Sequence, residues 1–203
     1  TIKRFNYKLL NSILDKFKII AFTHKTNDLS EIGSLHIEEN ALCERLAHLK
    51  NNLKIDELCY LSTCNRVEFL LATTSVINHD FLLKFFRAFN PLWTTEECSR
   101  AAEKADIYEE ETALQHLFRV ASSVDSMVVG EREIITQVRN AYEKCREMGL
   151  TGDLLRMIIK ATIETAKDVY TNTQIANKPV SVVSLAYRRL KDLNVQMDAR
   201  FLI

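Results

Sequence analysis

Hydrophobic and polar residues alternate along the first half of this chain in patterns that predict both strands and helices. Residues 17–23, FKIIAFT, are β-branched and aromatic and predict a strand. Two more strands are predicted over 57–63 and 67–73, on either side of a short polar stretch. Apolar residues at helical spacing predict helices over 37–49 and 80–89.

Short polar residues are expected to mark the beginnings of two helical segments. Asp80 is expected to cap the helix over 80–89, and Thr94-Thr95 is expected to begin one further short helical turn. The stretch His24 to Asp28 follows the first strand and is predicted to be a loop.

The second half of the chain is predicted to be helical. Glycines at 130 and 149 interrupt the helical pattern, and Pro179 breaks it again. The predicted helices are 110–121, 131–147, 153–172 and 181–193, and residues 198–203 are expected to begin a strand. Strands mixed with helices, followed by helices alone, predict an α+β domain and a helical connector.

Composition narrows the class of protein. The 203 residues include only 4 Gly and 2 Pro, which favours a helix-rich fold over an all-β protein with many turns. Lys+Arg and Asp+Glu both number 27, so the formal net charge is zero. A binding mode that relies on one large basic field is therefore excluded, and any nucleic acid would have to meet a local patch.

The five cysteines do not form a disulfide pattern, because their number is odd and their spacing irregular. Residues 1–20 lack the continuous apolar run of a signal peptide, and no 18-residue apolar run could span a membrane. We therefore expect a cytoplasmic location. Cys59 and Cys64 would lie on opposite faces of one strand, and no C-x-x-C or helical His pair occurs, so no metal site is expected.

The stretch YLSTCNRVEFL, residues 60–70, carries the most distinctive chemistry. A thiol at Cys64 stands two residues before Arg66, and a neighbouring cation lowers a thiol pKa and raises the thiolate fraction. The alternative is a buried structural cysteine, with Arg66 on the solvated surface. In a pocket, the Arg66 guanidinium would instead bind a carboxylate with two hydrogen bonds. Thr63 and Asn65 are either turn residues or hydrogen-bond donors to a substrate.

Two histidines and one loop are further candidates. His116 lies on an apolar helical stripe, so it is either a core histidine or a functional one. His24 opens a loop after a strand, where active-site residues often occur. Ser126 precedes Gly130 and a helix N-terminus whose amides could hold an anion. Glu133 and Gln137 would share a helix face, which an ordinary solvated face also explains.

Four segments together resemble glutamyl-tRNA reductases. They are FTHKT at 22–26, LSTCNRVE at 61–68, HLFRVASSVDSMVVGE at 116–131 and AKDVYTNTQI with PVSV within 166–182. The resemblance runs from about residue 18 to 203, with the motifs in the family's order.

The resemblance implies a ferredoxin-like catalytic domain over 18–150, an antiparallel sheet with helices. Residues 151–203 would be spinal helices that lead into an NADPH-binding Rossmann domain. No G-x-G-x-x-G or phosphate loop occurs among the four glycines, so this chain is expected to end just before that domain's glycine-rich loop. The implied cofactor is NADPH, and the implied partners are glutamyl-tRNA, a second copy of the chain and glutamate-1-semialdehyde aminomutase.

The resemblance also assigns roles. Cys64 would attack the ester of glutamyl-tRNA and form a thioester, which hydride from NADPH reduces to glutamate-1-semialdehyde at the start of tetrapyrrole synthesis. His116 would act near the thiol or the reacting carbonyl. The implied substrate-binding residues are Thr63, Asn65, Arg66, Ser126, Glu131, Arg132, Glu133 and Gln137.

The chain departs from the family at one point. Gly130-Glu131-Arg132-Glu133-Ile134 stands where many members have G-E-P-Q-I. Arginine adds a charge where proline would fix the backbone angle, and we expect Glu133 to pair with Arg132 or to bind the substrate's amino group. Two other functions remain open: a non-catalytic regulatory or interaction module, and a thiol hydrolase that acts on an unrelated ester.

Overall fold

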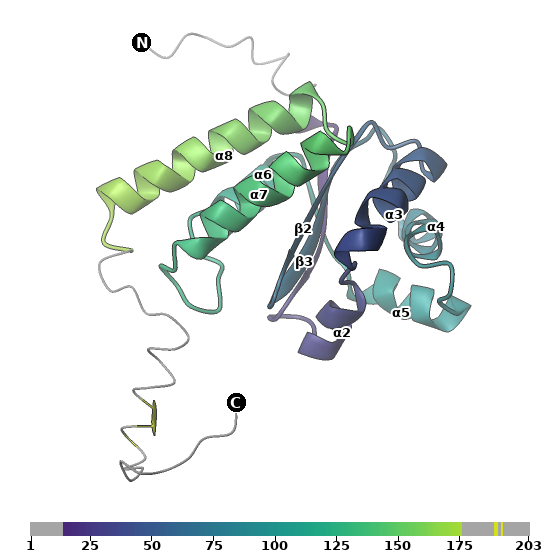
Figure 1. Cartoon of the computed structure of the whole chain (residues 1–203), viewed down its shortest axis with the longest axis horizontal. Coiled ribbons are helices and arrows are strands. Elements are labelled where there is room, and N and C mark those ends of the chain that lie inside the picture. Colours follow the sequence, from purple (N-terminus) through teal and green to yellow (C-terminus); the bar gives the residue numbers. More distant parts are fainter. Residues whose placement is uncertain (1–13, 176–188, 191, 193–203) are drawn as a thin grey trace.

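A four-stranded antiparallel sheet forms the centre of the molecule (Figure 1). The computed structural model describes residues 14–175, together with 189, 190 and 192. The strands are β1 (Phe17–Thr23), β2 (Glu57–Thr63), β3 (Arg66–Ala72) and β4 (Asp106–Glu109), in the spatial order β2-β3-β1-β4. Two β-helix-β units interleaved in this order make a ferredoxin-like sheet, which confirms the predicted fold class.

Helices cover both faces of the sheet (Figure 1). On one side lie α2 (Leu29–Ser34), α3 (Glu39–Asn52), α4 (His79–Phe89) and α5 (Thr95–Lys104). On the other side lie α6 (Glu110–Ala121), α7 (Glu133–Glu147) and α8 (Asp153–Asn172). None of the described helices is both long enough and apolar enough to cross a membrane.

Alternation along the central strands gives the two faces different chemistry. On the α4 side the core is aromatic: Phe69 of β3 lies edge-on to Phe85, with ring centroids 5.0 Å apart, and Phe22 of β1 does the same with Phe86 at 5.7 Å. All seven residues of β3 are buried, including Arg66 and Glu68. Since an isolated buried charge is costly, these two polar side chains need partners on the α6 side.

A carboxylate from the sheet fixes the position of α8. The Glu57 side chain accepts hydrogen bonds from the backbone amides of Gly152, Leu154 and Leu155 at 2.8, 3.0 and 2.9 Å. It thereby satisfies amides that the first turn of a helix leaves free, and its negative charge suits the helix dipole. A Cβ at position 152 would lie 2.7 Å from the same carboxylate, so any other residue there would displace the Glu57 side chain.

Most predicted elements agree with the structure. The strands 17–23 and 57–63 and the helices 110–121 and 153–172 have the predicted bounds, while 67–73 and 131–147 are shifted to Arg66–Ala72 and Glu133–Glu147. The helix predicted over 37–49 runs from Glu39 to Asn52. The predicted helix over 181–193 and strand over 198–203 lie outside the described residues, apart from 189, 190 and 192.

Two details of the prediction were wrong or incomplete. Asn78, not Asp80, caps α4: its Oδ1 accepts a hydrogen bond from the Phe81 amide at 2.9 Å, because the helix begins one residue before Asp80. Thr94 does cap a helix, but α5 extends over ten residues rather than a single turn. The short elements α2 and β4, of six and four residues, were not predicted, because so few residues show no periodicity.

Candidate active site

Cys64 lies at the tip of the β2–β3 hairpin. Thr63 and Arg66 are paired across the two strands, which leaves Cys64 and Asn65 as the turn. The Thr63 hydroxyl donates to Asn65 Oδ1 at 3.0 Å, and the His24 amide donates to the Asn65 carbonyl at 3.0 Å. Cys64 itself is an exposed free thiol. A structural role by burial is therefore excluded, and a large substrate can reach the sulfur.

Arg66 turns inward at the base of this hairpin and is only 1% exposed. One terminal nitrogen is 2.7 Å from Glu68 Oε1, and the other donates to the Asp125 carbonyl. A solvated surface arginine is thus excluded. The guanidinium has five N–H groups, and these two contacts do not use all of them. The remaining N–H groups could donate hydrogen bonds to a substrate carboxylate.

His116 reaches the same carboxylate from α6. Its Nε2 lies 3.0 Å from Glu68 Oε1, and its ring stacks on Tyr108 of β4 with centroids 4.0 Å apart and planes 13° apart. The histidine is buried at 6% exposure. Glu68 therefore joins the arginine on its own strand to a histidine on a helix, and Tyr108 restricts the tilt of the imidazole.

Glu68 is held as a carboxylate in this cluster. Burial by itself would raise the pKa of Glu68, but the hydrogen bond and charge of His116 and the charge of Arg66 outweigh it and lower the pKa below its usual value. Its second oxygen, Oε2, is buried without a hydrogen-bond partner in the described part of the chain. Glu68 Oε2 could therefore accept one further hydrogen bond.

A polar cavity of about 360 Å³ opens beside His116, between the β1–α2 loop, β4 and α6. Across it, Lys25 and Asp125 form an ion pair. Burial would raise the pKa of Asp125, but the hydrogen bond from Lys25 lowers it. Burial and the charges of Arg66 and Lys25 lower the pKa of His24. The lining residues are Thr23, Lys25, Thr26, Asp106, Tyr108, Thr112, Gln115, His116, Arg119 and Asp125.

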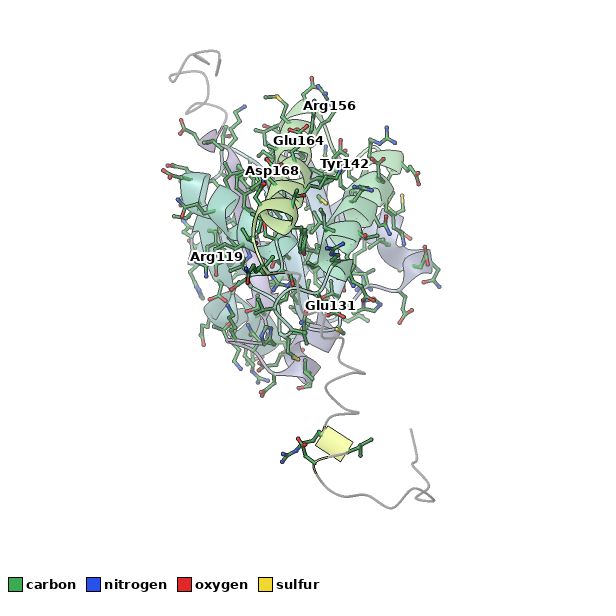
Figure 2. All side chains as sticks on the ribbon, turned by 90° about the vertical axis from the view of Figure 1, so that its left-hand side faces the viewer. Arg119, Glu131, Tyr142, Arg156, Glu164 and Asp168 are labelled. Carbon is green, nitrogen blue, oxygen red and sulfur yellow. The ribbon has the colours of Figure 1, made fainter. Side chains whose placement is uncertain are left out.

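The loop between α6 and α7 closes over this cluster. Ser123 adopts a positive φ of 58°, and its hydroxyl accepts a hydrogen bond from the Gly130 amide at 3.0 Å. The loop meets the cluster through the Asp125 carbonyl on Arg66. Ser126, Glu131 and Gln137 are half-buried. In the view of Figure 2, Glu131 and Arg119 lie on opposite sides of α8.

The structure unites some predicted residues and separates others. Arg66 and His116 share Glu68, and Thr63 and Asn65 shape the Cys64 turn. Arg132 turns away toward α8, where its guanidinium lies 5.8 Å from the centroid of the Tyr170 ring. Glu133 is exposed, and no ion pair joins it to Arg132 in residues 14–175. No hydrogen bond joins Cys64 to His116 in the described residues, where His116 Nε2 meets Glu68 instead.

Sequence reasoning missed Glu68 and Tyr108. Glu68 follows Arg66 by two residues in a strand, so strand periodicity places both side chains on one face, and a carboxylate inside a buried strand was an available signal. Tyr108 belongs to the unpredicted β4 and had no such signal. No group of three or more His, Cys, Asp or Glu side chains among the described residues is placed to hold a metal ion.

The family model described as "Glutamyl-tRNAGlu reductase, N-terminal domain" matches residues 20–173. The chain belongs to this family. Glutamyl-tRNA reductases of Campylobacter concisus and Wolinella succinogenes are 35% and 34% identical to it, over 86% and 87% of this chain. The glutamyl-tRNA reductase of Methanopyrus kandleri has a similar structure, with a TM-score of 0.66 and 25% identity over 88% of this chain.

The chain spans about 40% of the length of each of these glutamyl-tRNA reductases. The matched region contains the whole described sheet except the first residues of β1. It also contains the seven helices from α2 through α8. It therefore includes Cys64 and the Arg66, Glu68 and His116 cluster. The described residues contain no glycine-rich turn of the kind that holds a dinucleotide.

Proposed function

We propose that Cys64 attacks the ester carbonyl of glutamyl-tRNA. The sulfur–carbon bond forms, the ester carbon–oxygen bond breaks, and the ribose hydroxyl of the released tRNA takes up a proton. The observation that supports this step is the exposed thiol of Cys64 on a tight turn. Two residues later the chain places Arg66, whose side chain is buried. An acyl-tRNA ester is an activated substrate, and a thiolate is a strong nucleophile for it.

Arg66 is proposed to bind the carboxylate of the glutamyl group. In the described conformation it is buried beneath the Asp125 carbonyl, so a carboxylate can reach it only when this loop moves away. Such an exchange replaces a neutral acceptor by a charged one, which makes a stronger hydrogen bond. Thr63, Asn65, Ser126, Glu131 and Gln137 are proposed to contact the rest of the substrate. Arg132 and Glu133, which are exposed and lie apart from the cluster, are weaker candidates for that role.

His116 is proposed to transfer a proton during acyl transfer. Glu68 holds its Nε2, much as an aspartate orients the histidine of a serine-protease triad, and this leaves Nδ1 available. The stacked Tyr108 ring holds the plane of the imidazole. Because no hydrogen bond joins His116 to Cys64 in the described residues, we place the action of His116 at the substrate oxygen and not at the thiol.

The complete reaction is proposed from the family. NADPH would supply hydride that reduces the thioester to glutamate-1-semialdehyde and frees Cys64, the first step of 5-aminolevulinate and tetrapyrrole synthesis. No residue described here is assigned to that cofactor. We further propose a catalytic domain over 18–150 with linker helices over 151–203, a homodimer, the aminomutase as partner, and a cytoplasmic location.

The test is acyl transfer to a single cysteine. The chain is mixed with glutamyl-tRNA and quenched in acid, and its intact mass is measured for wild type, Cys64→Ser and the matched control Cys43→Ser. Cys43 is also an exposed free thiol, but it lies on α3. A glutamyl adduct in wild type and Cys43→Ser, absent in Cys64→Ser, is expected.

Two other results would redirect the assignment. If Cys64→Ser keeps the adduct, the thioester hypothesis is wrong. If Cys64→Ser also behaves like wild type in every other assay, the regulatory module is favoured. Equal turnover of simple esters that lack the glutamyl group would favour the thiol hydrolase.

A further inference from the structure

A second hollow of about 400 Å³ lies between α7 and α8, away from the cavity beside His116. We call it the α7/α8 groove. It is lined by Arg132, Ile135, Arg139, Lys167, Tyr170 and Thr171. Three of these six residues are cations and none is an acid. Arg132 and Arg139 are seven residues apart, or about 10.5 Å along the helix, so they face the groove two turns apart.

The cations of the groove differ from the others on the same two helices. Lys144, Arg146, Arg156 and Lys160 each form an ion pair with Glu39, Glu143, Asp153 and Glu164, respectively. In the described part of the chain, Arg132, Arg139 and Lys167 form none, and all three side chains are exposed. In a protein of zero net charge, the groove therefore concentrates uncompensated positive charge.

The groove is joined to the candidate active site. The Tyr170 hydroxyl on its floor donates to the carbonyls of Glu131 and Ala121, at 3.2 and 3.4 Å, which lie at the two ends of the loop that closes over Arg66. The same tyrosine ring carries the Arg132 guanidinium at 5.8 Å. The groove therefore borders the loop that closes over Arg66.

We propose that the α7/α8 groove binds the phosphate backbone of the tRNA near its aminoacylated end. This inference rests on the proposed function, which supplies an RNA substrate. The planar guanidinium of arginine can donate two parallel hydrogen bonds to phosphate oxygens, and a neighbouring aromatic ring can stack on a base. An acidic protein segment would have no base to stack on that ring. Among the groove residues, Arg139 and Lys167 lie furthest from Glu131 along α7 and α8. They should therefore contribute to tRNA affinity without affecting acyl transfer.

Direct binding tests the groove. Fluorescently labelled, uncharged tRNA for glutamate is titrated with the chain at several KCl concentrations. The groove variant is Arg139→Gln/Lys167→Gln, and the matched control is Lys84→Gln/Arg100→Gln, which removes the same charge from exposed positions on α4 and α5. Loss of two phosphate contacts should weaken binding roughly tenfold at about 0.1 M salt and reduce the salt slope by about 2. The control variant should bind like wild type.

The proposal is overturned by any of four results. They are no tRNA binding by wild type, groove-variant affinity within about twofold of wild type, an equal loss in the control, and displacement of tRNA by poly-glutamate as effective as by unlabelled RNA. The last result would assign the groove to an acidic protein.

A small acyl donor separates this proposal from the proposed function. Adenosine esterified with glutamate carries the reactive ester but no phosphate backbone. The groove variant should form the Cys64 adduct normally from this donor and about tenfold more slowly from glutamyl-tRNA at limiting concentration. If neither donor acylates wild type while tRNA binding still depends on the groove, the acyl-transfer function fails and the groove stands.

Discussion

Replacing Glu68 by glutamine tests the buried charge cluster most directly. The substitution keeps the shape of the side chain but removes the negative charge between Arg66 and His116, which are 2.7 and 3.0 Å from its Oε1. Glu68 is 0% and Arg66 1% exposed, so water cannot replace the lost charge. Removing one partner of such a buried pair typically costs about 3–5 kcal/mol in the free energy of unfolding. We expect a loss of this size at pH 7.

The pH dependence gives the sign of the effect. Folding lowers the pKa of Glu68, so the carboxylate stabilises the fold above its ordinary pKa of about 4.3. This stabilisation is lost as the pH falls through the lower pKa of the folded state. The amide of Glu68→Gln does not titrate. The difference in stability between wild type and variant should therefore be full near neutral pH and should shrink below about pH 4.

The assay is urea unfolding followed by circular dichroism at pH 7 and at two acidic values. Glu143→Gln is the control, because Glu143 pairs with Arg146 at the surface with both side chains about half exposed, and it should cost less than about 1 kcal/mol. A loss below about 1 kcal/mol for Glu68→Gln, or a difference that does not change with pH, would refute the claim that Glu68 compensates a buried guanidinium.

Two further predictions concern local structure and thiol reactivity. Asn78→Ala removes the side-chain cap of α4 and should lower the free energy of unfolding by about 1 kcal/mol in the same urea assay, whereas Asp80→Asn should change it by less than half as much; the reverse order would restore Asp80 as the cap. Brief alkylation of the native chain with iodoacetamide, read by peptide mass spectrometry, should modify exposed Cys64 and spare Cys59. A hydrogen bond with Cys145 and burial raise the pKa of the Cys59 thiol, so equal labelling of both would contradict the structure.

The long elements were predictable because each carries its own period. In α6 and α8 the apolar residues recur over twelve and twenty residues, and the seven residues of β1 are apolar or β-branched apart from Lys18. Short elements form for another reason. The four residues of β4 become a strand because β1 has a free edge that pairs with them from Lys18 to Ala21. That edge exists only after the sheet has assembled.

Motif and packing contributed differently to the candidate site. The sequence by itself determined that a thiol, an amide and a guanidinium stand in one short polar stretch between two strands, and strand periodicity was the unused signal that Arg66 and Glu68 share a face. Only the tertiary structure decided that His116 from α6 shares that carboxylate and that Arg132 turns to Tyr170 instead. Helical periodicity tells which side of a helix is apolar, but the position of that helix along a strand depends on packing between segments distant in the chain. A carboxylate such as Glu68 acquires its partners from that packing, because burial makes an unpaired charge too costly to keep.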